Sequence, residues 1–434
     1  MNKKYKLKLL TLIPVIFFSV SGGPYGLEEI VTSVGPFNTL FLVLILPIIW
    51  TIPETMIVAE LSSNYPVKGG YYRWVEMSLG RFWGFMEGWF SILYTLIDLS
   101  LYPILFTAYL KYFFCDLNFW EVYLIQILVI WISAFLNIVG IKLVGNVLTL
   151  FQLFIVFFFI IFIVFGCNYL SWDCLLKIKT AHSFSGNNIL FGLSLAFWNY
   201  IGWDNGSTVL HEVHEPETNY HKALFYTIPI VVLMYFFPLL VGIAIHPNWH
   251  EWKFGEFSHI ANSINHPILA LFLAIGGMVT CLGLFNSLLL SSSRVFSTMA
   301  EDKLFPESFA KNHKVFNTPY VAIIFASFVY SIFVLIDFNN LIIYDVFLYL
   351  IAMFLEAIAL VVLRRKNGIK SNFNIPFGDF GLYFVVGLAL SVILFMVLIN
   401  VFILRHSMHH LLYVIFPVIS GIPIYLFYTT RHKC

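Results

Sequence analysis

Long apolar segments recur along the whole chain, separated by short polar connections. Twelve of these segments have roughly the 20 residues that a helix needs to cross a bilayer. They comprise residues 11–34, 38–62, 82–112, 121–140, 146–166, 187–210, 222–246, 267–298, 319–337, 343–364, 381–402 and 409–429. The pattern predicts an all-α integral membrane protein with twelve transmembrane helices, forming one domain over residues 1–434.

Composition supports a membrane protein. Hydrophobic residues make up 60% of the 434 residues and charged residues 11%, which is too few to cover a surface that faces water. The apolar run from Leu9 to Val20 resumes after Gly26 and continues to Val34, so it is predicted to be the first spanning helix rather than a cleaved signal. A net charge of +1 argues against a nucleic-acid partner.

Basic residues are distributed unevenly over the predicted connections. Nineteen of the 24 Lys and Arg residues lie on the same side as the N-terminus, and five lie on the other side. Because cytoplasmic connections carry an excess of Lys and Arg, both termini are expected in the cytoplasm. The expected location is the cell membrane, either plasma or inner.

Two predicted spans contain helix-breaking residues and carboxylates. The first has the sequence GPYGLE at residues 23–28, and the sixth has NYIGWDNG at residues 199–206. A helix can break in the hydrocarbon core only where protein or a hydrated cavity satisfies the freed backbone groups. Each break opens a set of five spans, and an odd number inverts the second set. The pattern predicts inverted repeats over about 11–166 and 187–364, two extra helices over about 381–429, and a binding site where the breaks meet.

Further motifs accompany the first break. Its surroundings read SVSGGPYGLEE at residues 19–29, and the later motifs are IPE at 52–54, KGGY at 68–71, LGRFWGF at 79–85, IDLSLYP at 97–103 and MAEDKLFP at 299–306. Together they resemble the polyamine-uptake branch of the amino acid, polyamine and organocation superfamily, over about residues 15 to 380. The resemblance implies a twelve-helix fold with inverted five-helix repeats, and proton-coupled or exchange transport of amines and amino acids.

Carboxylates inside the predicted spans are the next clue. An ionised side chain at the bilayer centre costs about 2.5 to 3.5 kcal/mol on insertion scales, so function usually explains its presence. The carboxylates expected where water is scarce are Glu28, Glu54, Asp98 and Asp204. They would be stable if protonated, hydrogen-bonded or paired with a cationic substrate. The alternative is a proton-sharing structural network that holds the broken helices together.

Other acidic residues are given less direct roles by their positions. Glu60 is expected to be a solvated or loop-capping residue near the cytoplasmic end of the second span, and Asp345 is expected at the interface. Glu29 is expected to face the outer vestibule, Glu87 lies near the start of the third span, and Glu356 lies within the tenth.

Aromatic residues surround the second break. Trp198, Tyr200 and Trp203 lie within six residues, and aromatic faces attract ammonium groups by about 0.5 to 2 kcal/mol. The resemblance implies that Trp198 is a substrate-contacting or gating aromatic and that Asp204 is a site carboxylate. The predicted substrate-binding residues are Gly23, Tyr25, Gly26, Glu28, Asp98, Trp198, Tyr200 and Asp204.

Residue 28 bears on the class of substrate. Amino acid permeases of this superfamily commonly carry Gly-x-Gly in the first span, where backbone N–H groups bind the substrate carboxylate. Here the triplet is Gly26-Leu27-Glu28. A carboxylate at this point would repel a substrate carboxylate and attract a second ammonium group. We therefore expect a di- or polyamine such as putrescine or spermidine, with a permease or exchanger for cationic or neutral amino acids, or a non-transporting sensor, as alternatives.

Coupling is expected to use protons. Several proton-coupled relatives in this superfamily place a lysine in the fifth span. Residues 146–166 contain no lysine, which argues against coupling through a lysine in this chain. The candidates to bind the proton are Glu28, Glu54, Asp98 and Asp204.

Neither a metal, a cofactor nor an enzymatic reaction is expected. The sequence HEVHE at residues 211–215 lacks the second His of the zinc motif H-E-x-x-H. The five cysteines lack C-x-x-C spacing, so they indicate neither a metal cluster nor a disulfide framework.

Overall fold

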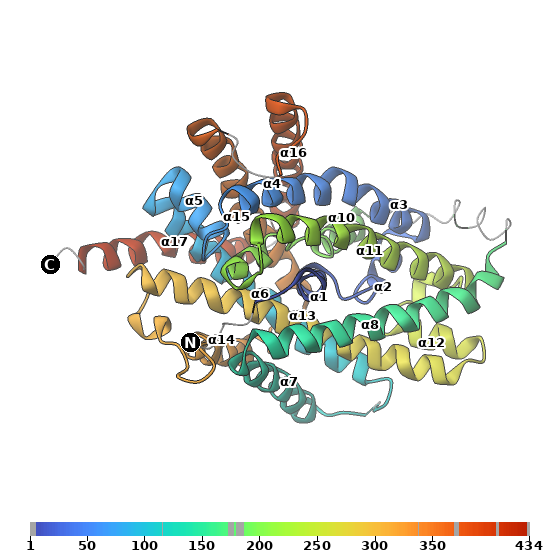
Figure 1. Cartoon of the computed structure of the whole chain (residues 1–434). Coiled ribbons are helices and arrows are strands. Elements are labelled where there is room, and N and C mark those ends of the chain that lie inside the picture. Colours follow the sequence, from blue (N-terminus) through green and yellow to red (C-terminus); the bar gives the residue numbers. More distant parts are fainter. Residues whose placement is uncertain are drawn as a thin grey trace.

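The computed structural model describes residues 6–114, 116–171, 178, 186–336, 338–368, 373–404 and 408–431, which are built from helices (Figure 1). The α-helices are α1 (Leu9–Val20), α2 (Glu28–Val34), α3 (Pro36–Leu46), α4 (Ile52–Asn64), α5 (Tyr71–Leu79), α6 (Arg81–Leu110), α7 (Phe119–Val139), α8 (Ile141–Gly166), α10 (Gly186–Trp198), α11 (Pro216–Ile245), α12 (Glu256–Ser263), α13 (Pro267–Glu301), α14 (Tyr320–Phe333), α15 (Phe338–Asn367), α16 (Gly378–Leu404) and α17 (Met408–Arg431). Shorter helical turns are η1 (Pro47–Thr51), η2 (Cys167–Tyr169), η3 (Asn205–Glu212), η4 (Trp249–Glu251) and η5 (Glu307–Ala310).

Within these ranges, eight helical stretches are long and apolar enough to cross a membrane. They are Pro36–Asn64, Arg81–Leu110, Phe119–Val139, Ile141–Tyr169, Pro216–Ile245, Pro267–Glu301, Leu341–Lys366 and Gly378–Phe402. The other predicted spans coincide with shorter apolar helices at Leu9–Val20, Ile189–Trp198, Tyr320–Phe333 and Ile415–Thr430. The all-α membrane class is confirmed, whereas the count of twelve crossings stays a prediction.

The first predicted span is interrupted in the structure. α1 ends at Val20, and α2 begins at Glu28 after an irregular segment. Gly23 and Gly26 have φ values of 90° and 93°, in the left-handed region that residues with a Cβ rarely adopt. Glycine at these two positions therefore allows the helix to break.

The sixth predicted span is also interrupted, and the two breaks touch. α10 ends at Trp198, and the chain is irregular until η3 begins at Asn205. Gly202 has a φ of 98°, and a Cβ there would lie 2.5 Å from the backbone oxygen of Ser19 in α1. Only glycine permits this close approach of the two backbones.

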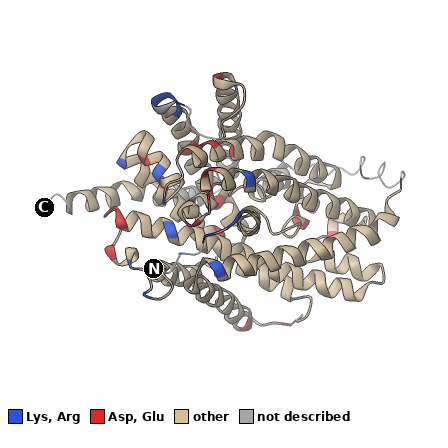
Figure 2. Cartoon of the chain, viewed as in Figure 1, with Lys and Arg blue, Asp and Glu red and all other residues tan. Residues whose placement is uncertain are grey.

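The broken helices lie inside the bundle. Figure 1 shows α1 near its middle, where α8, α11 and α13 pack against it, and α6 packs along both α13 and α15. Figure 2 shows several acidic residues in the interior of this bundle. The following carboxylates are at most 2% exposed: Glu28, Glu54, Glu60, Glu87, Asp204, Asp345 and Glu356.

One of these carboxylates corrects the sequence-based interpretation, and another matches one of its two alternatives. Glu60 was expected to be a solvated or loop-capping residue. It is not solvated, because it is 2% exposed, but it accepts a hydrogen bond at 2.7 Å from Ile375 N in the segment before α16, and Arg364 Nε lies 3.5 Å away. Asp345 was expected at the interface, but its side chain is fully buried because α15 packs against α6 and α10.

Candidate substrate-binding site

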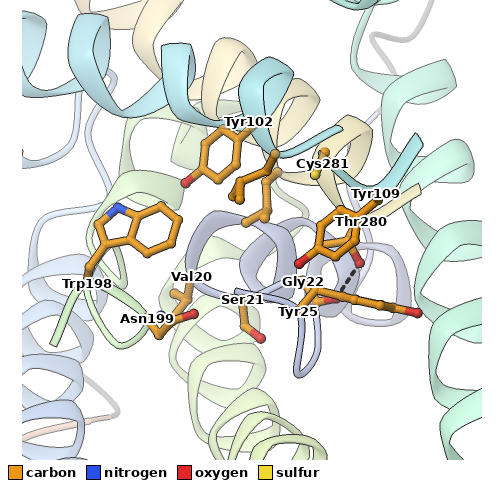
Figure 3. Close-up of a pocket in the computed structure, with 12 residues that line it drawn as sticks. Val20, Ser21, Gly22, Tyr25, Tyr102, Tyr109, Trp198, Asn199, Thr280 and Cys281 are labelled. Carbon is orange, nitrogen blue, oxygen red and sulfur yellow. Dashed lines mark hydrogen bonds between the residues drawn. The ribbon is translucent and has the colours of Figure 1, made fainter. Parts of the chain in front are cut away.

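Two adjoining cavities lie between the two breaks and α6, and Val20, Tyr102 and Trp198 line both of them. The aromatic cavity is also lined by Ser21, Gly22, Tyr25, Leu105, Tyr109, Asn199, Thr280, Cys281 and Leu284 (Figure 3). The acidic cavity is also lined by Ser19, Tyr94, Asp98, Ile201, Gly202, Asn205, Asp345 and Tyr349.

The wall of the aromatic cavity satisfies the backbone that the first break frees. Figure 3 shows Tyr102 and Tyr109 extending from α6 over this break, with Trp198 beside them. Thr280 Oγ1 in α13 donates to the Gly22 carbonyl at 2.5 Å. Tyr25 donates its hydroxyl proton to the Leu273 carbonyl at 2.6 Å, which fixes its ring in the cavity wall. Neighbouring helices therefore supply the partners that an interrupted helix requires in a membrane.

Asp98 is held at the acidic cavity by two aromatic donors. Tyr102 Oη lies 2.9 Å and 3.0 Å from its two carboxylate oxygens, and Trp198 Nε1 donates to Oδ1 at 3.1 Å. Tyr102 follows Asp98 by four residues, so both lie on one face of α6. The ring of Trp198 stacks with that of Tyr102 at a centroid distance of 6.0 Å. The structure thus brings together Asp98 and Trp198, and adds Tyr102 to the predicted set.

Asp345 is a second carboxylate at the acidic cavity, on α15. Its side chain is fully buried, neither oxygen has a donor within normal hydrogen-bond distance among the described residues, and the indole N–H of Trp198 is its polar neighbour. In the same part of the chain, no ion pair involves Asp98 or Asp345. A buried carboxyl group in this condition requires a proton or a cation. In the sequence, Asp345 lies inside an apolar run, which could have indicated a buried carboxylate. Because it lies near the end of that run, it was instead assigned to the interface.

Asp204 and Glu54 lie behind the acidic cavity and meet at one tyrosine. Tyr349 lines the cavity, and its hydroxyl lies 2.7 Å from Asp204 Oδ1 and within hydrogen-bond distance of Glu54 Oε1. Gly202 N also donates to the Tyr349 oxygen at 3.0 Å. Trp203 N donates to Glu54 Oε1 at 3.2 Å. The second break is thus tied to α4 and α15 through carboxylates that the described cavity linings do not include.

Glu28 differs from the sequence-based expectation in what it contacts. Its carboxylate accepts a hydrogen bond from Gly26 N at 2.8 Å and another from Gly255 N at 3.2 Å. Glu28 is fully buried, and the residues that line the two cavities do not include it. The carboxylate therefore satisfies freed backbone of the first break and links this break to the segment before α12.

Tyr200 is directed away from both cavities. Its hydroxyl donates to the Val43 carbonyl of α3 at 2.7 Å, and its ring packs against Tyr235 of α11. Trp198 and Tyr200 were both predicted to bind substrate, but Trp198 lines both cavities and Tyr200 lines neither. Gly23 and Gly26 shape the turn near the cavities without appearing among the lining residues.

Paired groups near the N-terminus join α13, η3 and the N-terminal segment. Arg294 Nε in α13 lies 3.0 Å from Glu212 Oε1 at the end of η3, and Arg294 is 3% exposed. Leu7 N donates to the Glu212 carbonyl at 2.8 Å, which fastens the N-terminal segment to the same point. His211 Nε2 lies 3.6 Å from the same oxygen, but partial desolvation lowers the pKa of His211, which leaves Arg294 as the permanent cation beside Glu212.

Comparison with known proteins agrees with this architecture. The sequence model of the amino acid permease family matches residues 8–422. The chain is 35% identical over 383 residues to a probable polyamine transporter of Arabidopsis thaliana, a match that covers 88% of this chain and 76% of the relative. It is 33% identical over 387 residues to a polyamine transporter of Oryza sativa subsp. japonica, covering 86% and 70%.

A more distant relative transports amino acids. The serine/threonine exchanger of Bacillus subtilis (strain 168) is 27% identical over 363 residues, covering 78% of this chain and 80% of that protein. The family match extends over nearly the whole chain, including both breaks and the cavities between them. The chain therefore belongs to the amino acid permease family and is a membrane transporter rather than an enzyme.

Proposed function

We propose that this permease carries di- or polyamines in preference to amino acids. The observation that carries the proposal is the pair of carboxylates, Asp98 and Asp345, at one cavity. Both are buried, and no cationic side chain pairs with them in the described part of the chain. An amine with two positive charges would neutralise both, with the ring of Trp198 beside it for a cation–π contact.

The first break supports the same class of substrate. A bound amino acid needs donors for its carboxylate, and the resemblance assigns this role to backbone N–H groups of the first break. Here Gly26 N donates to Glu28, and Gly23 N donates to Ser21 Oγ at 3.1 Å. The carboxylate of Glu28 thus takes the place of a substrate carboxylate. Polyamines have no carboxylate, so these internal bonds would not hinder their binding.

The names of the relatives agree with this proposal. Two plant relatives at 33% and 35% identity are described as polyamine transporters, the Arabidopsis one as probable. Amino acid exchange is the second candidate, because the bacterial serine/threonine exchanger matches 78% of the chain.

We further propose that transport is proton-coupled and that both termini lie in the cytoplasm. The distribution of 24 Lys and Arg residues supports the orientation, and buried carboxylates without cationic partners support the proton. We also propose that the helices within about residues 11–166 and 187–364 form two inverted repeats. The first helices of the two repeats would meet at their breaks, and α16 and α17 would be additional helices.

Flux measurements on the purified chain in proteoliposomes test the proposal. We expect accelerated exchange of internal for external labelled putrescine or spermidine, which a non-transporting sensor would not give. Excess unlabelled polyamine should compete, and leucine and serine should not. Asp98→Asn and Asp345→Asn should each reduce uptake by about tenfold or more, because each removes one charge-assisted contact of about 1.5 to 3 kcal/mol.

The exposed Glu307 in η5 provides a matched control. Glu307→Gln also removes one carboxylate, but Glu307 lines neither of the two cavities. This variant should transport like the wild type. Exchange of serine or leucine without exchange of any polyamine would contradict the proposal and favour the amino acid exchanger.

A further inference from the structure

We propose that a cluster of four buried carboxyl groups behind the acidic cavity carries the coupled proton, while Asp98 and Asp345 hold the amine. This acidic cluster consists of Glu54, Glu87, Asp204 and Glu356. The inference deepens the proposed function and rests on it, because it assigns proton and substrate to two separate sets of carboxylates.

Four different segments contribute to the acidic cluster. Glu54 belongs to α4, Glu87 to α6 and Glu356 to α15, and Asp204 ends the second break. Each of the four is at most 1% exposed. Asp204 interacts electrostatically with all three of the others. The cluster is therefore assembled by the packing of α4, α6 and α15 around the break, rather than by neighbours in sequence.

Several oxygens of the cluster are left without a donor. Glu54 Oε2, Glu87 Oε2 and both carboxylate oxygens of Glu356 are buried and have no N–H or O–H donor within bonding distance among the described residues. Glu356 also lies close enough to Asp204 for a hydrogen bond, which two carboxyl groups can form only if one of them is protonated. Burying an ionised carboxylate without a partner is costly, and several such groups in mutual reach cannot all be ionised. Unpartnered oxygens directed into a shared interior thus point to bound protons.

The groups that face the cluster cannot neutralise it. They are neutral phenols from four helices: Tyr71 of α5, Tyr94 of α6, Tyr220 of α11 and Tyr349 of α15. Ser91 is a further neighbour, 3.4 Å from Glu87 Oε1. Across the part of the chain that the structure describes, no Lys, Arg or His forms an ion pair with any member. Protons are therefore the charge that balances the cluster.

Tyr349 connects the cluster to the cavity and independently calls for a proton. Its hydroxyl lies within hydrogen-bond distance of both Glu54 and Asp204, yet a phenol has one proton to donate. Both contacts are hydrogen bonds only if one of the two carboxyl groups is protonated and donates to the phenol oxygen. The same oxygen lies beside the acidic cavity, so the proton and the amine are held next to each other.

Charge balance favours co-transport of the two. A doubly charged amine between Asp98 and Asp345 would be neutralised there and would not expel a proton from the cluster behind Tyr349. Both ligands would then cross together, and uptake would be driven by an inwardly directed proton gradient. One coupled proton supports about a tenfold greater accumulation for each pH unit.

The test compares gradient-driven accumulation with counterflow in proteoliposomes. Uptake of labelled putrescine is measured for the wild type, Glu87→Gln, Glu356→Gln and the control Glu307→Gln. The outside is about one pH unit more acidic than the inside, and protein-free vesicles correct for passive movement. We expect the gradient to raise accumulation about tenfold in wild type and Glu307→Gln. In Glu87→Gln and Glu356→Gln, the ratio of gradient-driven accumulation to counterflow should fall by about that factor, because glutamine cannot exchange a proton.

A measurement on the unmodified protein covers the case in which a variant does not fold. Dicyclohexylcarbodiimide reacts with protonated carboxyl groups in apolar surroundings, and mass spectrometry locates the product. Labelling of Glu87 or Glu356 at neutral pH, with slower labelling as the pH rises, is the expected result.

The outcomes separate this inference from the proposed function. Absence of polyamine exchange in the wild type would overturn the proposed function itself. Exchange in the wild type, combined with full pH-gradient dependence in both glutamine variants, would overturn only the role of the cluster. Uptake driven by a sodium gradient and not by a pH gradient, or no carbodiimide labelling of the cluster at neutral pH, would overturn it as well.

Discussion

Glu28 bears on the proposed class of substrate although it lines neither cavity. Its Oε2 accepts a hydrogen bond from Gly26 N, and its Oε1 accepts one from Gly255 N. A donor already bonded to a buried carboxyl group is not free for a ligand carboxylate. Under the proposed function, Glu28 therefore disfavours substrates that carry a carboxylate, because it occupies this donor.

Replacement of this side chain by glycine tests the argument. Glu28→Gly restores a Gly-x-Gly triplet and frees the Gly26 N–H group, so arginine should become a competitor of putrescine uptake. The concentration of arginine for half inhibition should fall by about tenfold or more, as expected for one hydrogen bond to a charged group of about 1.5 to 3 kcal/mol.

The neighbouring Glu29 offers the matched control, because Glu29→Gly removes a partly buried carboxylate that does not bond these two backbone groups. That variant should leave arginine a poor competitor. An unchanged arginine response in a folded Glu28→Gly protein would refute the role given to Glu28.

At the scale of elements, the breaks were predictable and the directions of their side chains were not. Gly23 and Gly202 marked the two interruptions, because glycines beside polar residues in an apolar span indicate a place where the helix is broken. The side chains of Trp198 and Tyr200 contact different neighbours, as residues two positions apart do on a regular helix, so the break that follows them does not bring both to one face. Asp345 was misjudged for a related reason, because hydropathy locates a span but not the face that packs inward.

The contact between the breaks gives an element-scale prediction. Gly202→Ala introduces a Cβ that would lie 2.5 Å from the Ser19 oxygen, at a φ of 98°. The left-handed conformation alone costs about 1 kcal/mol or more, and the clash adds to it. We expect lower thermal stability in detergent and loss of polyamine exchange.

Gly387→Ala provides the comparison within the same chain. Gly387 lies in the middle of α16, and a Cβ there meets nothing within 4 Å. This variant should be as stable as the wild type or slightly more so, because alanine favours helix by about 1 kcal/mol over glycine. Equal effects of the two substitutions on stability would show that the breaks are not in close contact.

For the whole molecule, paired groups near the N-terminus connect elements that would have to separate if the cavities open on this side. Arg294 and Glu212 join α13 to η3, and Leu7 connects the N-terminal segment to the same point. α13 and η3 both also contribute to the region around the second break, where Thr208 of η3 contacts Ser291 of α13 at 2.9 Å. Opening of this side would therefore have to separate elements that also shape the substrate site.

The native thiol of Cys281 can report such an opening. It is free and buried, and it lines the aromatic cavity. Glu212→Gln removes the charge that pairs with the buried Arg294, so the closed conformation should lose stability and the open one should become more populated. A shift of about 1.4 kcal/mol corresponds to a tenfold change in population, and the rate of Cys281 labelling by a charged thiol reagent, measured by mass spectrometry, should rise by about that factor. Putrescine should slow the labelling by occupying the cavity.

The exposed pair Lys68–Glu301 serves as the control, because Glu301→Gln breaks an ion pair whose side chains are 38% and 35% exposed, and such pairs contribute little. Equal labelling rates in the wild type and Glu212→Gln would mean that the Arg294 pair does not hold this side closed.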